Sequence, residues 1–389
     1  MTASVPHPSW PLSAGSKGPI VARVFALTDV GHIREHNEDT FLVADLESGM
    51  PVDMDGPPRE LTLAQHGLLF LVADGMGGAA SGELASSMAG DVVIDTLRET
   101  WVSAPSTSHE QFAAALLDAT DTANARIHRF SRENPQHRGM GTTATIAGLL
   151  GDRLFLAQVG DSRAYLVRSG LAKQLTKDQS LMQRLVEAGE MTQEEADASE
   201  RRNIILQALG PEAQVTIDLT HQQIRRGDTL ILCSDGLSGL VRANEIAQVA
   251  TELNDPRIMC ERLVARANEL GGPDNITVIA VRFEGDALSA TRDDDAMGYT
   301  AFPLRGTLAG DTLENRAPQA PFRSDPTPQF GTPLPARSAL EEEFNRARDA
   351  ETAEIPTPAP ERQEQLGSIR VLLMLVVLLV VAWFAYRML

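Results

Sequence analysis

The chain has 389 residues, 43% of them hydrophobic, which is enough for one large globular domain or two ordinary ones with a real core. Its formal net charge of -19 argues against a nucleic-acid partner, because an acidic surface gains nothing from releasing phosphate counterions. Only two cysteines, Cys233 and Cys260, are present, and neither stands in a metal-binding or redox spacing, so we expect no disulfide framework.

Residues 1–19 combine Pro, Ser and Gly without an apolar run of signal-peptide length, so we expect a disordered N-terminus that stays in the cytosol. From residue 20 to 284 short β-rich runs occur among longer amphipathic ones. The predicted strands are Val21–Thr28, Leu68–Ala73, Thr143–Leu150, Arg153–Val159, Arg163–Arg168, Thr229–Cys233 and Asn275–Phe283. The predicted helices are Gly82–Trp101, Glu110–Arg132, Gln179–Glu187, Ala243–Leu253 and Arg257–Leu270. Because the strands cluster between pairs of helices, the pattern favours an α+β architecture with antiparallel pairing.

Residues 285–367 have the composition of a linker, since ten of the chain's 22 prolines lie between Phe283 and Gly367. After them comes an uncharged apolar block, Val371–Tyr386, with no Pro or Gly. As a helix it would be about 24 Å long, and the flanking Arg370 and Arg387 would reach the two interfaces of a membrane. A buried core helix is the alternative, but the linker separates this block from the domain that would bury it. We therefore predict that residues 368–389 are a single-pass tail anchor in the inner (cytoplasmic) membrane, with the preceding globular domain in the cytoplasm.

Four short segments place an aspartate directly after an apolar strand or in a tight turn that contains glycine. They are NED at 37–39, ADGMGG at 73–78, SDG at 234–236 and GGPDN at 271–275. Taken singly, each aspartate is a turn-former or helix cap. Brought together at the ends of strands, they would make an all-oxygen site, which selects magnesium or manganese over zinc. Two such ions about 4 Å apart acidify a bridging water and neutralise phosphate charge.

Six motifs in order make the pattern more specific. They are DVGHIREHNED at Asp29–Asp39, ADGMGGAASGE at Ala73–Glu83, GTTAT at Gly141–Thr145, VGDSRAY at Val159–Tyr165, SDGL at Ser234–Leu237 and GGPDNIT at Gly271–Thr277. Over roughly residues 22–283 this series resembles the type 2C metal-dependent serine/threonine protein phosphatases in their compact bacterial form.

The resemblance implies a four-layer αββα sandwich of two antiparallel sheets flanked by helices, in a domain spanning residues 20–284. It also implies two tightly bound manganese or magnesium ions and a third, weaker one. By matching position, the resemblance gives Arg34 the task of gripping the substrate phosphate and places Glu38 and Asp39 near the first metal, partly through bound water. The metal ligands that it implies are the Asp74 carboxylate, which bridges both ions, the Gly75 carbonyl, Asp235 and Asp274 on the other ion, and Asp161 on the third.

The function implied is hydrolysis of phosphoserine and phosphothreonine in proteins, by attack of a metal-bridging hydroxide, in opposition to a bacterial Ser/Thr kinase. An alternative is a catalytically silent sensor of the same fold that binds phosphoproteins. Such a protein would be expected to lack one of Asp74, Asp235 and Asp274, and this chain has all three. A third possibility is a scaffold whose important parts are the linker and the membrane tail.

The chain departs from the wider family at two places. Met76 stands where some members carry a histidine that is proposed to protonate the leaving oxygen, which leaves the general acid unassigned. In the flap beside the cleft, residues 175–210, bacterial relatives often read Asp-His-Ser, and this chain reads Asp178, Gln179 and Ser180.

Two other patterns are coincidental. Gly75, Gly77 and Ala80 match a dinucleotide fingerprint, but the acidic residue about 20 positions on, Asp95, lies inside a helical run instead of ending a strand. Cys260 has an arginine six residues on, as in cysteine-dependent phosphatases, but the residues between them contain no glycine and read as helix.

Overall fold

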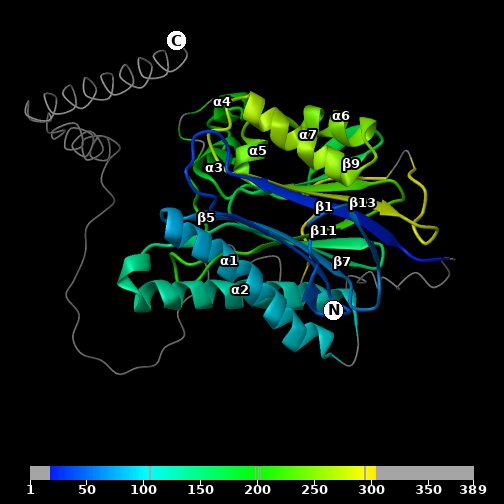
Figure 1. The fold of residues 1–389 in the computed structure, drawn as a ribbon, viewed down its shortest axis with the longest axis horizontal. Helices are drawn as coiled ribbons and strands as arrows, with labels where there is room; N and C mark the ends of the chain where they lie inside the picture. Colours follow the sequence, from blue (N-terminus) through cyan, green and yellow to red (C-terminus); the bar gives the residue numbers. More distant parts are fainter. Residues whose placement is uncertain are drawn as a thin grey trace, which may run out of the picture. The chain divides into compact units, whose positions relative to one another are not determined.

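The computed structural model describes residues 18–303, apart from residues 105, 106, 198, 200, 202, 293 and 294. Two antiparallel sheets lie face to face, and helices cover both outer faces (Figure 1). The first sheet has the strand order β10-β9-β12-β13-β1-β4, with strands β1 (Val21–Asp29), β4 (Arg59–Thr62), β9 (Arg163–Arg168), β10 (Leu171–Gln174), β12 (Thr229–Cys233) and β13 (Ile276–Glu284). The second has the order β11-β8-β7-β5-β2-β3, and β6 pairs with β5; its strands are β2 (Asp39–Asp45), β3 (Met50–Pro51), β5 (Leu68–Met76), β6 (Gly141–Thr142), β7 (Ala144–Leu150), β8 (Arg153–Val159) and β11 (Asp218–Gln223).

Two pairs of helices form the outer layers. Helix α1 (Ala79–Leu97), which continues into a π-helical turn at Arg98–Val102, and helix α2 (His109–Glu133) pack on the second sheet. A 3-10 turn at Pro135–His137 follows α2. Helices α6 (Ala243–Glu252) and α7 (Pro256–Glu269) pack on the first sheet. Three short helices, α3 (Leu181–Glu187), α4 (Gln193–Asp197) and α5 (Asp235–Ser238), lie together at one end of the sandwich (Figure 1).

Three apolar layers hold the four structural layers together. Side chains such as Val24, Phe70 and Leu230 fill the space between the sheets, so the central strands are buried on both faces. Strand β7 shows the result in its sequence, ATIAGLL, which is buried throughout and, apart from Thr145, apolar rather than alternating. The αββα sandwich expected from the sequence is therefore confirmed for the described residues.

The predicted elements agree with the structure where burial is strongest. Strands β8, β9 and β12 have the predicted bounds. Helices α2 and α7 differ from the predictions by one residue at each end, and α6 by one residue at its C-terminal end. The sequence analysis did not predict β2, β4, β10 and β11. Strands β4 and β10 are short and half-exposed, and β11 has the polar sequence DLTHQQ, so these three carry no strong apolar signal. Strand β2, with the sequence DTFLVAD, does contain an apolar run, which the sequence analysis missed.

The domain does not stop where the linker was expected to begin. In residues 285–303, Leu288 and Phe302 are buried, Ala301 forms an antiparallel bridge with Thr220, and Asp295 accepts hydrogen bonds from Arg225. Only one of the ten prolines counted above, Pro303, lies in this stretch, so the linker composition begins later than residue 285. Packing therefore continues to the end of the described segment.

The remaining regions expected from the sequence lie outside the described residues. They are most of the N-terminus, the rest of the linker and the predicted membrane span at residues 368–389. Among the described residues, no helix is long and apolar enough to cross a membrane.

Candidate active site

The pairing register of two neighbouring strands places two carboxylates side by side. Strands β2 and β5 are antiparallel, and Asp39 lies directly opposite Asp74. Opposed residues in such a pair have Cβ atoms about 5 Å apart, so the two side chains share one place at the end of the sheet. The backbone of Asp74 is fixed by the next strand along, because its carbonyl accepts hydrogen bonds from Thr143 N at 2.8 Å and from Thr142 Oγ1 at 2.9 Å.

The Asp39 carboxylate is held on one side only. Its Oδ2 accepts a hydrogen bond from Ser234 Oγ at 2.8 Å, and Thr277 also donates to this carboxylate. Its Oδ1 is buried and has no hydrogen-bond partner. Burial, and then the charges of Asp235 and Asp274, raise the pKa of Asp39 to about 7, although the two hydroxyl donors favour the charged form.

Asp235 reaches the same place from the first sheet, at the start of the short helix α5. It shares a hydrogen bond with Asp74, and its Oδ1 is buried without a partner. Burial and the charge of Asp274 raise its pKa. The following residue, Gly236, lies so close to the Asn275 carbonyl that a Cβ would not fit there. The glycine of the SDG motif is therefore needed for close packing of the two loops.

Asp161 follows β8 in the turn before β9 and is also buried, with an unpartnered Oδ1. Burial, and then the charges of Asp235 and Asp178, raise its pKa well above the usual value for an aspartate. The pKa of Asp74 is likewise raised well above its usual value, by burial first and then by Asp39, Asp235, Asp161 and Asp274. The structure thus brings the five aspartates singled out from the sequence into one electrostatically coupled group.

Glu38 and Gly75 lie beside this group. The Gly75 N–H donates to the Glu38 carbonyl at 3.1 Å, and Gly75 pairs with Thr142 between β5 and β6. A Cβ on Gly75 would collide with the Gly82 carbonyl, and a Cβ on Gly82 would collide with the Glu38 carboxylate. The two glycines therefore leave the room in which the Glu38 side chain lies against the first turn of α1.

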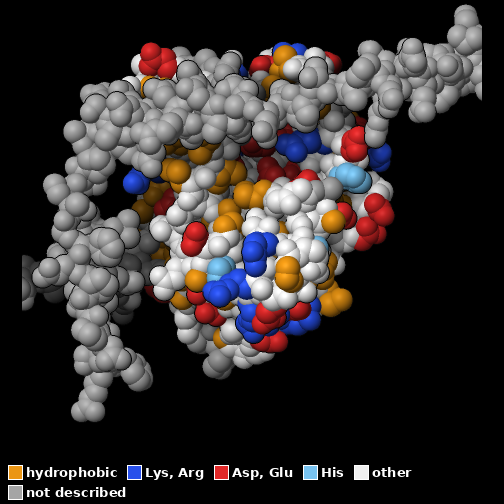
Figure 2. Space-filling view, turned by 90° about the vertical axis from the view of Figure 1, so that its left-hand side faces the viewer, with side chains coloured by type: hydrophobic (Ala, Val, Ile, Leu, Met, Phe, Trp, Pro, Cys, Tyr) orange, Lys and Arg blue, Asp and Glu red, His pale blue; other side chains and the backbone are white. Residues whose placement is uncertain are grey.

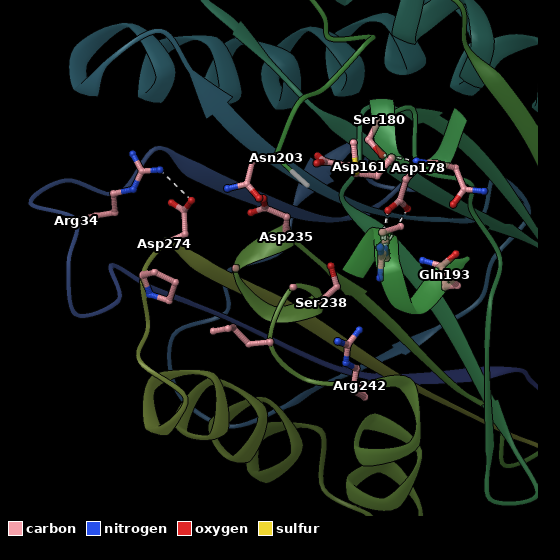
Figure 3. A pocket seen from close by; sticks show the side chains of 18 residues that line it. Arg34, Asp161, Asp178, Ser180, Gln193, Asn203, Asp235, Ser238, Arg242 and Asp274 are labelled. Atoms are coloured by element: carbon pink, nitrogen blue, oxygen red, sulfur yellow. Dashed lines mark hydrogen bonds and ion pairs between the residues drawn. The ribbon is translucent and has the colours of Figure 1, made fainter. Parts of the chain in front are cut away.

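Arg34 projects from the loop between β1 and β2 toward the same group (Figure 3). Its Nη2 donates to Asp274 Oδ2 at 2.9 Å, and half of its side chain is exposed. The hydrogen bond to Asp274 raises the pKa of Arg34, which keeps the guanidinium charged. A guanidinium in this position still has donors that face the solvent, as planar, bidentate recognition of a phosphate requires.

A pocket of about 230 Å³ opens beside Asp161, Asp235 and Asp274. Arg34 lines it on one side, and Ser180, Gln193 and Asn203 line it from the flap (Figure 3). The pocket therefore connects the carboxylates to a groove between the flap and the loop that follows α5.

Supporting residues that the sequence analysis did not single out fix this arrangement. Asn275 is the central one, because its side chain donates to the carbonyls of Val30 and His36 and accepts from the Glu38 N–H. Asn275, Ser234 and Thr277 all belong to the motifs quoted above. Their position close to a motif aspartate was the sequence signal that could have identified them as supporting residues.

The flap triplet has defined partners. Asp178 accepts two-pronged hydrogen bonds from Arg163, at 2.6 Å for Nη2 to Oδ2 and 3.0 Å for Nε to Oδ1. Gln179 bonds to the backbone of Gly160 at one end and to the Thr216 carbonyl at the other. Ser180 caps α3. Met76, at the end of β5, brings no group that donates a proton.

The donor set fits hard divalent cations. Three buried carboxylate oxygens, on Asp39, Asp161 and Asp235, lack hydrogen-bond partners, and burial and mutual repulsion raise the pKa of each of these residues. A divalent cation would stabilise the charged forms of such a group. Among the described residues, no three His, Cys, Asp or Glu side chains already surround a single point as a finished metal cluster.

The chain is similar to known protein phosphatases in both sequence and structure. The family model for protein phosphatase 2C matches residues 60–268. Serine/threonine phosphatase Stp of Listeria monocytogenes is 36% identical over 269 residues, which cover 68% of this chain and 97% of that protein. The crystal structure of the Mycobacterium tuberculosis serine/threonine phosphatase PstP/Ppp superposes with a TM-score of 0.56 at 35% identity, over 68% of this chain and 99% of that one. A structure of the PstP catalytic domain with two manganese ions is 34% identical, with a TM-score of 0.54 and the same coverage.

The chain therefore belongs to the protein phosphatase 2C family, and it is an enzyme of the bacterial serine/threonine phosphatase type. The matched range contains Asp74, Asp161 and Asp235, whereas Arg34 and Asp274 lie outside it.

Proposed function

We propose that this enzyme hydrolyses phosphoserine and phosphothreonine in proteins by direct attack of water on phosphorus, without a phosphoenzyme. The observation that carries the proposal is the group of five coupled aspartates, three of them with unpartnered buried oxygens, beside an arginine that faces a pocket. When bound there, two manganese or magnesium ions supply an activated water at neutral pH and neutralise phosphate charge.

The chain's own residues have separate tasks in this mechanism. Asp74, with the Gly75 carbonyl, Asp235 and Asp274, would hold the two ions, and Asp161 a third. Glu38 and Asp39 would orient water beside the first of them.

Arg34 would bind the substrate phosphate through the guanidinium donors that Asp274 does not use. Catalysis then depends on positioning and charge neutralisation more than on covalent chemistry. Because Met76 donates no proton, the leaving serine or threonine oxygen would take its proton from water in the pocket.

A catalytically silent sensor is less well supported. Asp74, Asp235 and Asp274 are all present, and all contribute to the coupled group. Each residue that the resemblance assigns to a metal ion has an oxygen able to bind a cation.

We also propose a cellular setting for the enzyme. It would oppose a bacterial Ser/Thr kinase, as expected for a phosphatase of this type. The apolar block Val371–Tyr386 would anchor it as a single helix in the cytoplasmic membrane, with the catalytic domain in the cytoplasm. Fractionation of the full chain against a chain that ends at Glu364 tests the anchor: recovery of both in the soluble fraction would refute it.

The activity is tested with the full chain on p-nitrophenyl phosphate and on a phosphothreonine peptide. Turnover should require added manganese or magnesium and should disappear with a chelator. Asp74→Asn should abolish turnover and leave the fold intact, since it removes a ligand charge without creating a cavity. Full turnover in excess chelator after dialysis would refute the metal mechanism, and more than about a tenth of the wild-type rate in Asp74→Asn, a loss under ~1.4 kcal/mol, would remove that residue from it.

A further inference from the structure

Several exposed apolar side chains lie close in sequence to residues that line the pocket. Nine large hydrophobic side chains are exposed in the part of the chain that the structure describes, and five of them lie within four residues of a pocket-lining residue. These five are Val30 and Ile33 near Arg34, Ile204 and Leu206 near Asn203, and Leu270 near Pro273. Figure 2 views this end of the domain, where hydrophobic side chains lie beside acidic and basic ones. Single exposed apolar residues are ordinary, but a concentration at a functional pocket indicates a contact surface.

Ile33 is the most exposed of the five, at 71%, and it directly precedes Arg34. Its loop is braced at several points. The His32 N–H donates to the Gly272 carbonyl at 2.7 Å, and the Asn275 side chain donates to the carbonyls of Val30 and His36. Gly31, at φ 77°, approaches the Asp274 carbonyl so closely that no Cβ would fit. The loop therefore displays an apolar side chain at a fixed place beside the proposed phosphate-binding arginine.

A second apolar segment borders the pocket on the flap. Residues 204–206 run alongside residues 179–181, with hydrogen bonds from Leu181 N to the Ile204 carbonyl at 2.9 Å and from Leu206 N to the Gln179 carbonyl at 2.7 Å. Ile204 is 43% exposed and Leu206 45% exposed. Gln179 in turn bonds to Gly160, in the turn that carries Asp161. This segment is thus attached to the same framework as the carboxylates.

The charged pocket and the apolar side chains beside it would interact differently with a small phosphate ester and with a phosphorylated polypeptide. A small ester fills only the position between Arg34 and the carboxylates. The residues that flank a phosphorylated side chain in a polypeptide must pass over the rim of the pocket, where Ile33, Ile204 and Leu206 gain by losing contact with water.

We propose that Ile33, together with the flap residues Ile204 and Leu206, binds an apolar side chain within two residues of the phosphorylated serine or threonine. These residues make the enzyme prefer protein substrates with an apolar neighbour at that position. The inference rests on the proposed function, since it concerns the polypeptide that the same site would dephosphorylate. It assigns Ile33 a role in specificity and none in the chemical step.

The test measures kcat/KM of the full chain on phosphothreonine peptides that carry leucine or serine at each position from two before to two after the phosphothreonine. At one position the wild type should favour leucine about five-fold, which corresponds to about 1 kcal/mol. Ile33→Ser should reduce this preference below about two-fold and leave kcat/KM for p-nitrophenyl phosphate unchanged. Leu171→Ser is the matched control, because Leu171 is 60% exposed on β10 and neither lines the pocket nor neighbours in sequence a residue that does. It should keep the full preference.

Three results would overturn the proposal. One is the absence of a leucine preference at every position, and another is a preference that Ile33→Ser leaves intact. The third is a change from dimer to monomer in Ile33→Ser on sedimentation with unchanged peptide preference, which would make this surface an interface between two copies. Failure of the wild type to hydrolyse p-nitrophenyl phosphate with manganese would instead refute the proposed function, and this inference with it.

Discussion

Phe302 provides the sharpest test of where the catalytic domain ends. It lies in the stretch assigned to the linker on composition, yet its side chain is only 8% exposed. Its ring packs edge-on against Phe155 at 5.3 Å and against His221 at 5.6 Å, and its N–H donates to the Leu219 carbonyl at 2.9 Å. Removing a buried phenylalanine ring costs about 3–5 kcal/mol. We take the lower figure for Phe302→Ala, because the residue packs at the margin of its core.

In a domain of this size a loss of about 3 kcal/mol lowers Tm by roughly 6–12 °C. Thermal unfolding of the full chain followed by circular dichroism measures the shift. Thr291→Ala, an exposed position in the same stretch, should stay within about 0.5 kcal/mol of wild type. Phosphatase activity of Phe302→Ala well below its Tm should match wild type, because Phe302 does not line the pocket. Equal Tm values for Phe302→Ala and wild type would show that residues 285–303 are not part of the folded domain.

Four further predictions concern the site and its surroundings. Asp161→Ala should lose activity at limiting manganese and regain it in excess, so identical metal titrations for variant and wild type would show that a third ion does not matter. Arg34→Ala should raise KM for p-nitrophenyl phosphate about tenfold with a smaller effect on kcat, and an unchanged KM would exclude phosphate binding by Arg34. Asp178→Ala leaves the largely buried Arg163 without its partner and should cost about 3–5 kcal/mol in urea unfolding, whereas a change under about 1 kcal/mol would contradict the importance of that pair. Burial and the charge of Arg153 lower the pKa of His221 to about 4, so the unfolded chain takes up this proton first as the pH falls. The contribution of His221 to stability should therefore decline from about pH 7 to pH 4, so His221→Asn should lose less stability than the wild type over this interval in denaturant titrations.

Much of the fold was predictable because most strands are buried on both faces. Runs such as RLFLAQV in β8 and TLILC in β12 are apolar and rich in β-forming residues, so their bounds could be read directly. Strand β10, with the sequence LAKQ, is a half-exposed edge strand whose stability comes from its pairing with β9. The stability of such a strand depends on pairing with a neighbouring strand, which the strand's own sequence pattern does not reveal.

The site was predictable in its residues but not in its geometry. A motif aspartate marks chemistry, yet the register that sets Asp39 opposite Asp74 is a property of the pair β2–β5, and β2 was not predicted. The role of Asn275 was equally hidden, because its partners Val30 and His36 are more than 230 positions away in the sequence. Arg163 and Asp178 belong to quoted motifs, but only folding shows that they bind each other.

Because β1 pairs with β13 from Val21↔Glu284 to Asp29↔Ile276, the first and last strands of the sandwich are neighbours. During synthesis, Asp39 leaves the ribosome long before Thr277, which donates to its carboxylate, and before Asn275, which fixes the loop that carries Arg34. A nascent chain that ends before Asn275 lacks this residue and β13, which carries Thr277, so it contains most of the strands but cannot complete the active site. Premature termination or proteolysis before residue 275 should therefore yield inert fragments in place of weakened enzymes.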